Sequence, residues 1–156
     1  MTAFTDTLGF YKGTAAVGAH ADKKLGYVEV NLDFAKIVAA RLAASATALA
    51  AGDTLQVLQV PANVLMLAGG ITVVSAETTN TTATFDLGCV GGTPIALNAF
   101  ADDFASNALA SKSVGLAAPV QFTAADTIDL LLNTAVPANA KIKCWALFYD
   151  IDSTRS

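Results

Sequence analysis

The stretch KIKCWALFYD, residues 141–150, decides the fold of this protein. One set of alternating residues is apolar throughout, which is the period of two of a β-strand: Ile142, Cys144, Ala146 and Phe148. The other set begins with lysines and then becomes apolar as well: Lys141, Lys143, Trp145, Leu147 and Tyr149. This strand is therefore half polar and half apolar on its second face.

A second apolar face needs a cover, because a lone antiparallel sandwich normally leaves its outer faces polar. Three other stretches show the same doubling: Leu65-Met66-Leu67, Val73-Val74 and Leu130-Leu131-Leu132. Packing between subunits would supply the cover, and so would a helix or a terminal arm of the same chain. The pattern predicts a constitutive oligomer, with Leu131, Trp145 and Tyr149 as candidate contact residues.

Turn signals about every ten residues divide most of the chain into short strands. Strands are predicted at 27–33, 54–60, 64–76, 82–88, 120–123, 127–134 and 141–150. Apolar residues at helical spacing follow Asp33, a plausible N-cap, and predict one short helix over 34–49. Residues 95–113 fit a loop or one helical turn. Because no βα unit repeats, we expect an all-β fold, an antiparallel β-sandwich or jelly roll of about eight strands.

The first 24 residues lack a sustained period of either kind. We therefore expect an extended N-terminal arm over 1–24 and one sandwich domain over 25–156. The arm carries four large apolar side chains that could anchor on a neighbouring subunit or another protein: Phe4, Leu8, Phe10 and Tyr11. A solvated terminus is the alternative interpretation.

Composition indicates a protein partner. Hydrophobic residues make up 54% of the chain and charged residues 14%, against about 45–50% and about 25% in ordinary soluble domains. Polar residues interrupt every apolar stretch before the ~20 residues of a membrane-spanning helix, and the N-terminus has no basic region of a signal peptide. The net charge is −4, and no basic run exceeds Lys23-Lys24, so neither a membrane nor a nucleic acid is expected as a partner.

The residue types of enzyme active sites are scarce. His20 is the one histidine, and it falls in the predicted arm. Cys89 and Cys144 lie in predicted strands and fit small buried hydrophobes, with a disulfide between them as the alternative. Asp102-Asp103 with Asn98 and Asn107 could hold a calcium ion, but we expect a solvated loop there. We expect no enzymatic activity, no cofactor and no metal.

Several longer segments resemble small virion proteins of tailed phages, the capsid decoration or cement proteins. The similarity covers about residues 26–152 and is carried by GYVEVNLDFAKIVAARLAA (26–44), ALAAGDTLQVLQVPANVLMLAGGITVVSA (48–76), TTATFDLGCVGG (81–92) and FTAADTIDLLLNTAVPANAKIKCWALFYDID (122–152). None of these segments is a chemical motif, and the predicted arm has no part in the resemblance.

The resemblance implies a homotrimeric knob on the outer surface of a phage capsid. Its partners would be the major capsid protein and its own copies, and it would stabilise contacts between capsomers. It would reside in the virion, after assembly in the host cytoplasm. The alternative is a receptor- or glycan-binding module of a fibre or tail, in which four aromatic residues would stack on sugar rings: Tyr27, Phe100, Trp145 and Tyr149. The two alternatives differ in whether the protein binds tail-less heads.

Overall fold

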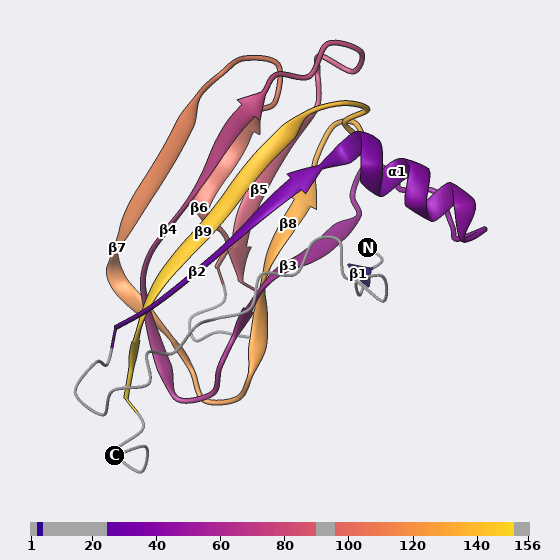
Figure 1. The fold of residues 1–156 in the computed structure, drawn as a ribbon. Coiled ribbons are helices and arrows are strands. Elements are labelled where there is room, and N and C mark those ends of the chain that lie inside the picture. The colour runs from indigo at the N-terminus through magenta and orange to yellow at the C-terminus, as the bar shows by residue number, and fades with distance from the viewer. Residues whose placement is uncertain (1–2, 5–24, 90–95, 152–156) are drawn as a thin grey trace.

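The computed structural model describes residues 3–4, 25–89 and 96–151. These residues form nine strands and one helix (Figure 1). The strands are β1 (Ala3–Phe4), β2 (Leu25–Asp33), β3 (Thr54–Val60), β4 (Val64–Ser75), β5 (Thr84–Cys89), β6 (Ala96–Ala105), β7 (Ser111–Phe122), β8 (Asp126–Leu132) and β9 (Lys141–Asp150). The helix is α1 (Phe34–Ala43).

The strands form two sheets, and their order does not follow the chain. One sheet has the order β1-β3-β8-β5-β6 and the other β2-β9-β4-β7. All neighbours are antiparallel except β1 and β3, which run parallel. The predicted all-β sandwich with one short helix is confirmed, while its jelly-roll description stays a prediction. Of the predicted arm, the structure describes Ala3–Phe4 alone.

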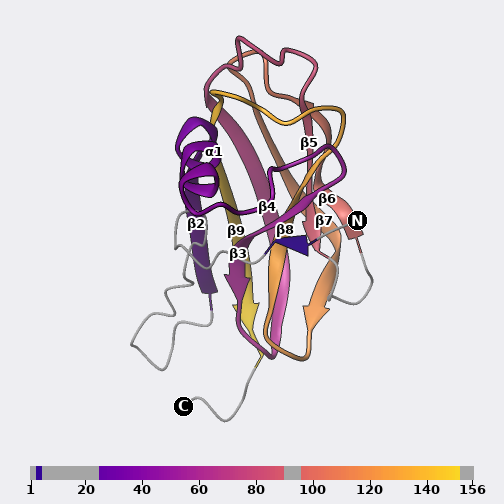
Figure 2. The ribbon, with the colours of Figure 1, turned by 90° about the vertical axis from the view of Figure 1, so that its right-hand side faces the viewer.

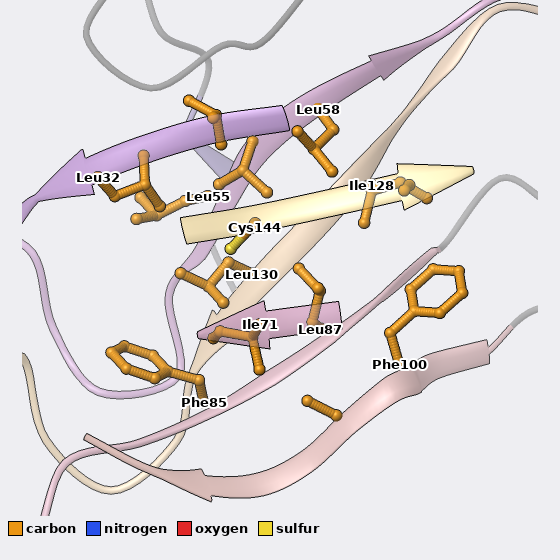
Figure 3. Close-up of a cluster of buried hydrophobic side chains, with 14 of the residues drawn as sticks. Leu32, Leu55, Leu58, Ile71, Phe85, Leu87, Phe100, Ile128, Leu130 and Cys144 are labelled. Carbon is orange, nitrogen blue, oxygen red and sulfur yellow. The ribbon is translucent and has the colours of Figure 1, made fainter. Parts of the chain in front are cut away.

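The inward side chains of the two sheets meet in one hydrophobic core (Figure 3). β9 contributes the alternating set predicted from its sequence, and all four members are buried: Ile142, Cys144, Ala146 and Phe148. Phe34 stacks on Phe85 with 5.6 Å between ring centroids and joins α1 to this core. Cys89 and Cys144 are both buried and form no disulfide with each other, so the disulfide alternative is wrong.

Helix α1 is shorter than predicted and does not cover a sheet. It begins behind Asp33, whose carboxylate accepts a hydrogen bond from the Lys36 N–H at 3.4 Å, as an N-cap does. It ends at Ala43, and Ser45 has a φ of 51°, which turns the chain out of the helical path. Phe34 and Ile37 are its buried residues. The rest of α1 projects from the end of β2 (Figure 1 and Figure 2).

Most of the described region 96–113 is strand, not the loop or helical turn predicted for 95–113, and only 106–110 between the two strands is irregular. β6 occupies 96–105 and β7 begins at Ser111. The period of two is broken here because the β5–β6 register shifts twice. Asp103 lies at the first of these shifts and has a φ of 48°, which is not an extended conformation. The alternation of apolar and polar residues that would indicate a strand is therefore interrupted.

The Glu77 side chain connects two loops of the sandwich, the one between β4 and β5 and the one between β8 and β9. It lies in the polar segment between β4 and β5, yet it is 2% exposed. Its carboxylate accepts five backbone N–H bonds of 2.7–3.0 Å, from Thr79, Asn80, Ala138, Asn139 and Ala140. Burial alone would raise the pKa of Glu77, but these hydrogen bonds outweigh it and lower the pKa to about 2.

Candidate interaction surface

Three neighbouring strands bring the second apolar set of β9 together with outward residues of β2 and β4. Leu25 lies opposite Tyr149 and Tyr27 opposite Leu147, while Leu65 on β4 flanks Tyr149 from the other side. Residues paired across antiparallel strands share a face of the sheet. The resulting apolar face consists of Leu25, Tyr27, Leu65, Trp145, Leu147 and Tyr149.

The apolar face is open to solvent. Leu25 is 58% exposed, Tyr27 45% and Tyr149 37%. The other three members are half-buried. Single exposed apolar residues are normal on a protein surface, but contiguous ones mark interaction sites. This surface can therefore bind an apolar protein surface.

Trp145 lies at the end of the apolar face that borders the polar half, opposite Glu29 on β2, and is fixed by its neighbours. Its ring stacks on Tyr27 with 6.1 Å between centroids and 26° between the planes. The position of Gly70, directly opposite on β4, leaves room for the indole, since a Cβ there would lie 2.8 Å from Trp145 Nε1. Trp145 is therefore a half-buried surface side chain that its neighbours hold in place.

Ion pairs border the apolar face on its polar half. Lys143 Nζ lies 3.3 Å from Glu29, and Lys141 Nζ lies 3.2 Å from Asp33. The Tyr27 hydroxyl donates to Glu29 at 2.7 Å. Hydrogen bonds from Tyr27 and Lys143 lower the pKa of Glu29, whereas partial desolvation and the Glu29 carboxylate raise the pKa of Tyr27 to about 12. Glu29 is thus charged, and Tyr27 neutral, at any physiological pH.

The opposite sheet carries different chemistry on its outer side. The sequence has no Lys, Arg or His between Asp53 and Ser111. Asp86, Asp103 and Asp129 lie around Leu131 on β5, β6 and β8, and this outward surface is called the acidic face. Asp86 accepts hydrogen bonds from the Asp103 N–H and from Asn133, both at 2.7 Å.

Asp129 is the least solvated acid of this face, at 8% exposed. Desolvation raises its pKa to about 6, although Thr127 donates a hydrogen bond to it at 2.8 Å and works against that rise. At neutral pH the sandwich therefore holds a poorly solvated charge on one face and apolar rings on the other.

The contact residues predicted from the sequence do not form one cluster. Trp145 and Tyr149 lie together on the apolar face, while Leu131 is half-buried on the acidic face. Phe4 belongs to β1, beside Leu55 of β3. The structure does not describe three further candidates: Leu8, Phe10 and Tyr11.

Sequence reasoning missed Leu25 as a member of the surface. Alternation puts Tyr27 on the same side of its strand as Glu29, Asn31 and Asp33 and gives no sign of its apolar neighbours. Only the pairing of β2 with β9 shows that the first half of β2 lies beside the apolar half of β9. The alternation of residues within one strand does not indicate which residues of another strand lie beside them.

No metal-binding arrangement is present within residues 25–89 and 96–151. Groups of three or more His, Cys, Asp or Glu side chains that could hold an ion do not occur there. His20 lies outside the described residues. Over the same residues, the structure has no helix of the length and apolarity that crossing a membrane requires.

Comparison with known proteins places this fold among chains of phage capsids. A chain in the capsid of Ralstonia phage GP4 aligns with 88% of this chain and 91% of its own length, at 15% identity and a TM-score of 0.58. A chain in the capsid asymmetric unit of cyanophage Pam1 aligns with 86% and 91%, at 16% identity and a TM-score of 0.51. No protein-family model and no curated protein matches the sequence. The sandwich fold is thus shared with chains found in phage capsids.

Proposed function

We propose that this chain is a structural protein of a phage virion, a decoration or cement protein that binds the outer surface of the capsid. The exposed apolar face carries this proposal, because a sandwich with apolar rings on its outside needs a protein partner. The fold shared with chains from two phage capsids supports the choice of that partner. The major capsid protein is the partner we propose.

The physical role is to add buried area across the junctions between capsomers. A specific interface buries about 1,200–2,000 Å² in total. Many copies on one shell multiply the effect, since each bound copy must be lost before a junction opens. A protein with this role needs a rigid contact surface and no reactive groups. Trp145, held between Tyr27 and Gly70, meets the first need.

In this proposal Trp145 and Tyr149 form the centre of the capsid contact. Tryptophan and tyrosine are enriched among the residues that dominate binding energy at interfaces. Leu131 stands apart on the acidic face and is left to a contact between subunits. We propose a homotrimer in solution and on the shell. An arm over residues 1–24, with Phe4, Leu8, Phe10 and Tyr11, would extend the contact beyond the sandwich domain.

Tail-less heads of the phage that encodes this chain, purified without the protein, test the proposal. We expect the protein to sediment with these heads at a fixed number of copies, and to raise the temperature at which they release DNA. Matched heads that already carry the protein are the control and should bind no more. Binding to tails or fibres in place of heads would support a receptor-binding module instead. Light scattering coupled to size exclusion tests the trimer.

A further inference from the structure

β2 forms one edge of its sheet over its whole length. The order β2-β9-β4-β7 leaves its second side without a strand, and within the described residues no other strand pairs with it. β2 lies at the side of the sandwich in Figure 2, next to α1. The side of β2 away from β9 is called the β2 edge.

One hydrogen bond identifies the residues of β2 whose backbone N–H and C=O groups point to the β2 edge. The Phe34 N–H donates to the Ala140 carbonyl at 3.0 Å, directly after the last pair of the β2–β9 ladder, Asp33 and Lys141. N–H and C=O directions alternate along an extended strand, so even-numbered residues of β2 face β9. Odd-numbered residues therefore direct their backbone groups to the β2 edge: Leu25, Tyr27, Glu29, Asn31 and Asp33.

Within the described residues, each of the other sheet edges has a bulge, a proline or a covering strand, whereas the β2 edge has only charged side chains to oppose strand pairing. Bulges, proline, charged side chains and short or covered strands are the usual protections. The register of β7 jumps between Val120 and Gly115, and Pro119 in this interval has no N–H to donate. The register of β6 shifts twice, and β3 is partly covered by β1. β2 keeps one register through nine residues and contains no proline.

We propose that the β2 edge takes up an extended strand of the capsid shell protein, which continues the sheet β2-β9-β4-β7 by one strand. The proposal rests on the proposed function and adds the mode of attachment. Backbone hydrogen bonds would supply affinity, and the outward side chains of β2 would select the partner. Leu25 and Tyr27 belong to both the β2 edge and the apolar face, so a strand added here would also cover their exposed rings and methyl groups.

Charge favours the shell protein over a second copy as the occupant. The outward side chains of β2 include Glu29 and Asp33 and no basic residue. Antiparallel pairing of two β2 strands about their centre would place Glu29 opposite Glu29, and like charges directly opposite are destabilising. The strand that fits has apolar side chains opposite Leu25 and Tyr27, and a basic or neutral one opposite Glu29.

Two substitutions at Asn31 separate the backbone from the side chain. Asn31→Pro removes one N–H from the β2 edge, where proline is tolerated because the lost N–H faces away from the ladder. Asn31→Ala is the matched control, which keeps that N–H. Both variants should melt within a few degrees of the parent protein. We expect Asn31→Pro to bind tail-less heads about tenfold more weakly than Asn31→Ala, because one hydrogen bond and its neighbours are lost.

A substitution one residue earlier checks the assignment of even and odd positions. The Val30 N–H faces β9, so Val30→Pro should destabilise the protein far more than Asn31→Pro. Equal destabilisation by both variants would contradict the assignment and overturn the proposal.

Hydrogen exchange on the unchanged protein gives a second measurement. The odd-numbered amides of β2 should exchange fast in the free protein and at least about tenfold more slowly on heads. Binding to heads without such protection, and without a difference between the Asn31 variants, would overturn the proposed strand pairing and leave the capsid function standing. Protection already present in the free protein would show that this chain covers its own edge, which also overturns it. Failure of the parent protein to bind heads would instead refute the capsid function.

Discussion

The apolar face exposes Leu25, Tyr27 and Tyr149 around the held ring of Trp145, whereas the acidic face surrounds Leu131 with carboxylates. Both faces arise from the same alternation of inward and outward residues. On the acidic face, Leu131 has acids as outward neighbours, so it is not part of a contiguous apolar surface. On the apolar face, the outward residues of β2, β9 and β4 reinforce one another.

This difference shows that the apolar residues of one strand are not sufficient to form an interaction surface, because the neighbouring strands must also contribute apolar residues. Leu130-Leu131-Leu132 and Trp145-Ala146-Leu147 are equally apolar in sequence. Their neighbours across the sheet separate them, because Thr54 and Asp86 lie opposite Leu131, whereas Tyr27 lies opposite Leu147 and stacks on Trp145. The predictions below contrast the two faces, beginning with the largest expected effect.

Removing the Trp145 ring should abolish most binding to heads. Trp145→Ser should weaken binding about a thousandfold, about 4 kcal/mol, as expected for an aromatic residue that dominates an interface. Its cost in folding stability should be about 1–2 kcal/mol, below the 3–5 kcal/mol of a fully buried large residue, because the ring is half-buried. Sedimentation with heads and thermal melting measure the two effects.

The matched change on the acidic face is Leu131→Ser. It should change binding to heads less than about threefold, since a lone apolar side chain adds little contact area. Equal losses for the two variants would mean that both faces touch the shell, and the contrast between them would fail.

Glu77 should be the acid on which stability depends most. Its pKa is depressed to about 2 from 4.5, so its contribution is fully present above about pH 4.5 and is lost as the pH falls toward 2. Glu77→Gln should cost about 3 kcal/mol at pH 7, because an amide NH₂ replaces an oxygen that accepts backbone N–H bonds. Urea unfolding at pH 7 and pH 3 measures this. Glu29→Gln, on the exposed rim of the apolar face, is the control and should have a small effect.

Asp129 should behave in the opposite way. Its pKa is raised from 3.8 to about 6, so its stabilising contribution is fully present below pH 3.8 and is lost as the pH rises through 6. Asp129→Asn should stabilise the protein by about 2 kcal/mol at pH 7, while the amide oxygen still accepts from Thr127. Unfolding curves between pH 4 and pH 7 test this. Asp102→Asn, which replaces an exposed acid of the same sheet, should change stability by less than about 0.5 kcal/mol.

The smallest effect concerns one hydroxyl of the apolar face. Tyr27→Phe removes the hydrogen bond to Glu29 but keeps the ring that stacks on Trp145, and should cost less than about 1 kcal/mol in stability. Binding to heads should be unchanged, whereas Tyr27→Ser should weaken it about tenfold. If Tyr27→Phe weakens binding as much as Tyr27→Ser, the Tyr27 hydroxyl and not its ring contributes to binding, and the proposal of an apolar contact at Tyr27 is wrong.

Much of the fold could be predicted from the sequence where alternation, turn residues or a helix cap alone determines the local structure. β3, β4 and β9 follow from alternation and turn residues, and the start of α1 follows from its Asp33 cap. β6 could not be predicted, because two register shifts and the turned backbone of Asp103 break its alternation. The end of α1 was misplaced since alanines after Ala43 favour a helix that the positive φ of Ser45 prevents.

The candidate surface was predictable only in part. Trp145 and Tyr149 are visible within one strand, but Leu25 and Leu65 join them through pairing between strands distant in the sequence. Glu77 carried no signal at all, since the N–H groups it accepts come largely from residues 138–140, about sixty positions away.

The pairing of Leu25 with Tyr149 has a consequence for rewiring the chain. β2 and β9 are the first and last strands of the region 25–151, and they lie side by side. Leu25, at the start of β2, is therefore a cross-strand neighbour of Tyr149, near the end of β9, about 5 Å away. A linker of a few residues could therefore join residue 151 to residue 25, with new ends opened in the exposed segment 107–110 between β6 and β7. Such a circular permutant would keep both sheets, and cargo attached at its new ends would leave the molecule far along the strands from the apolar face.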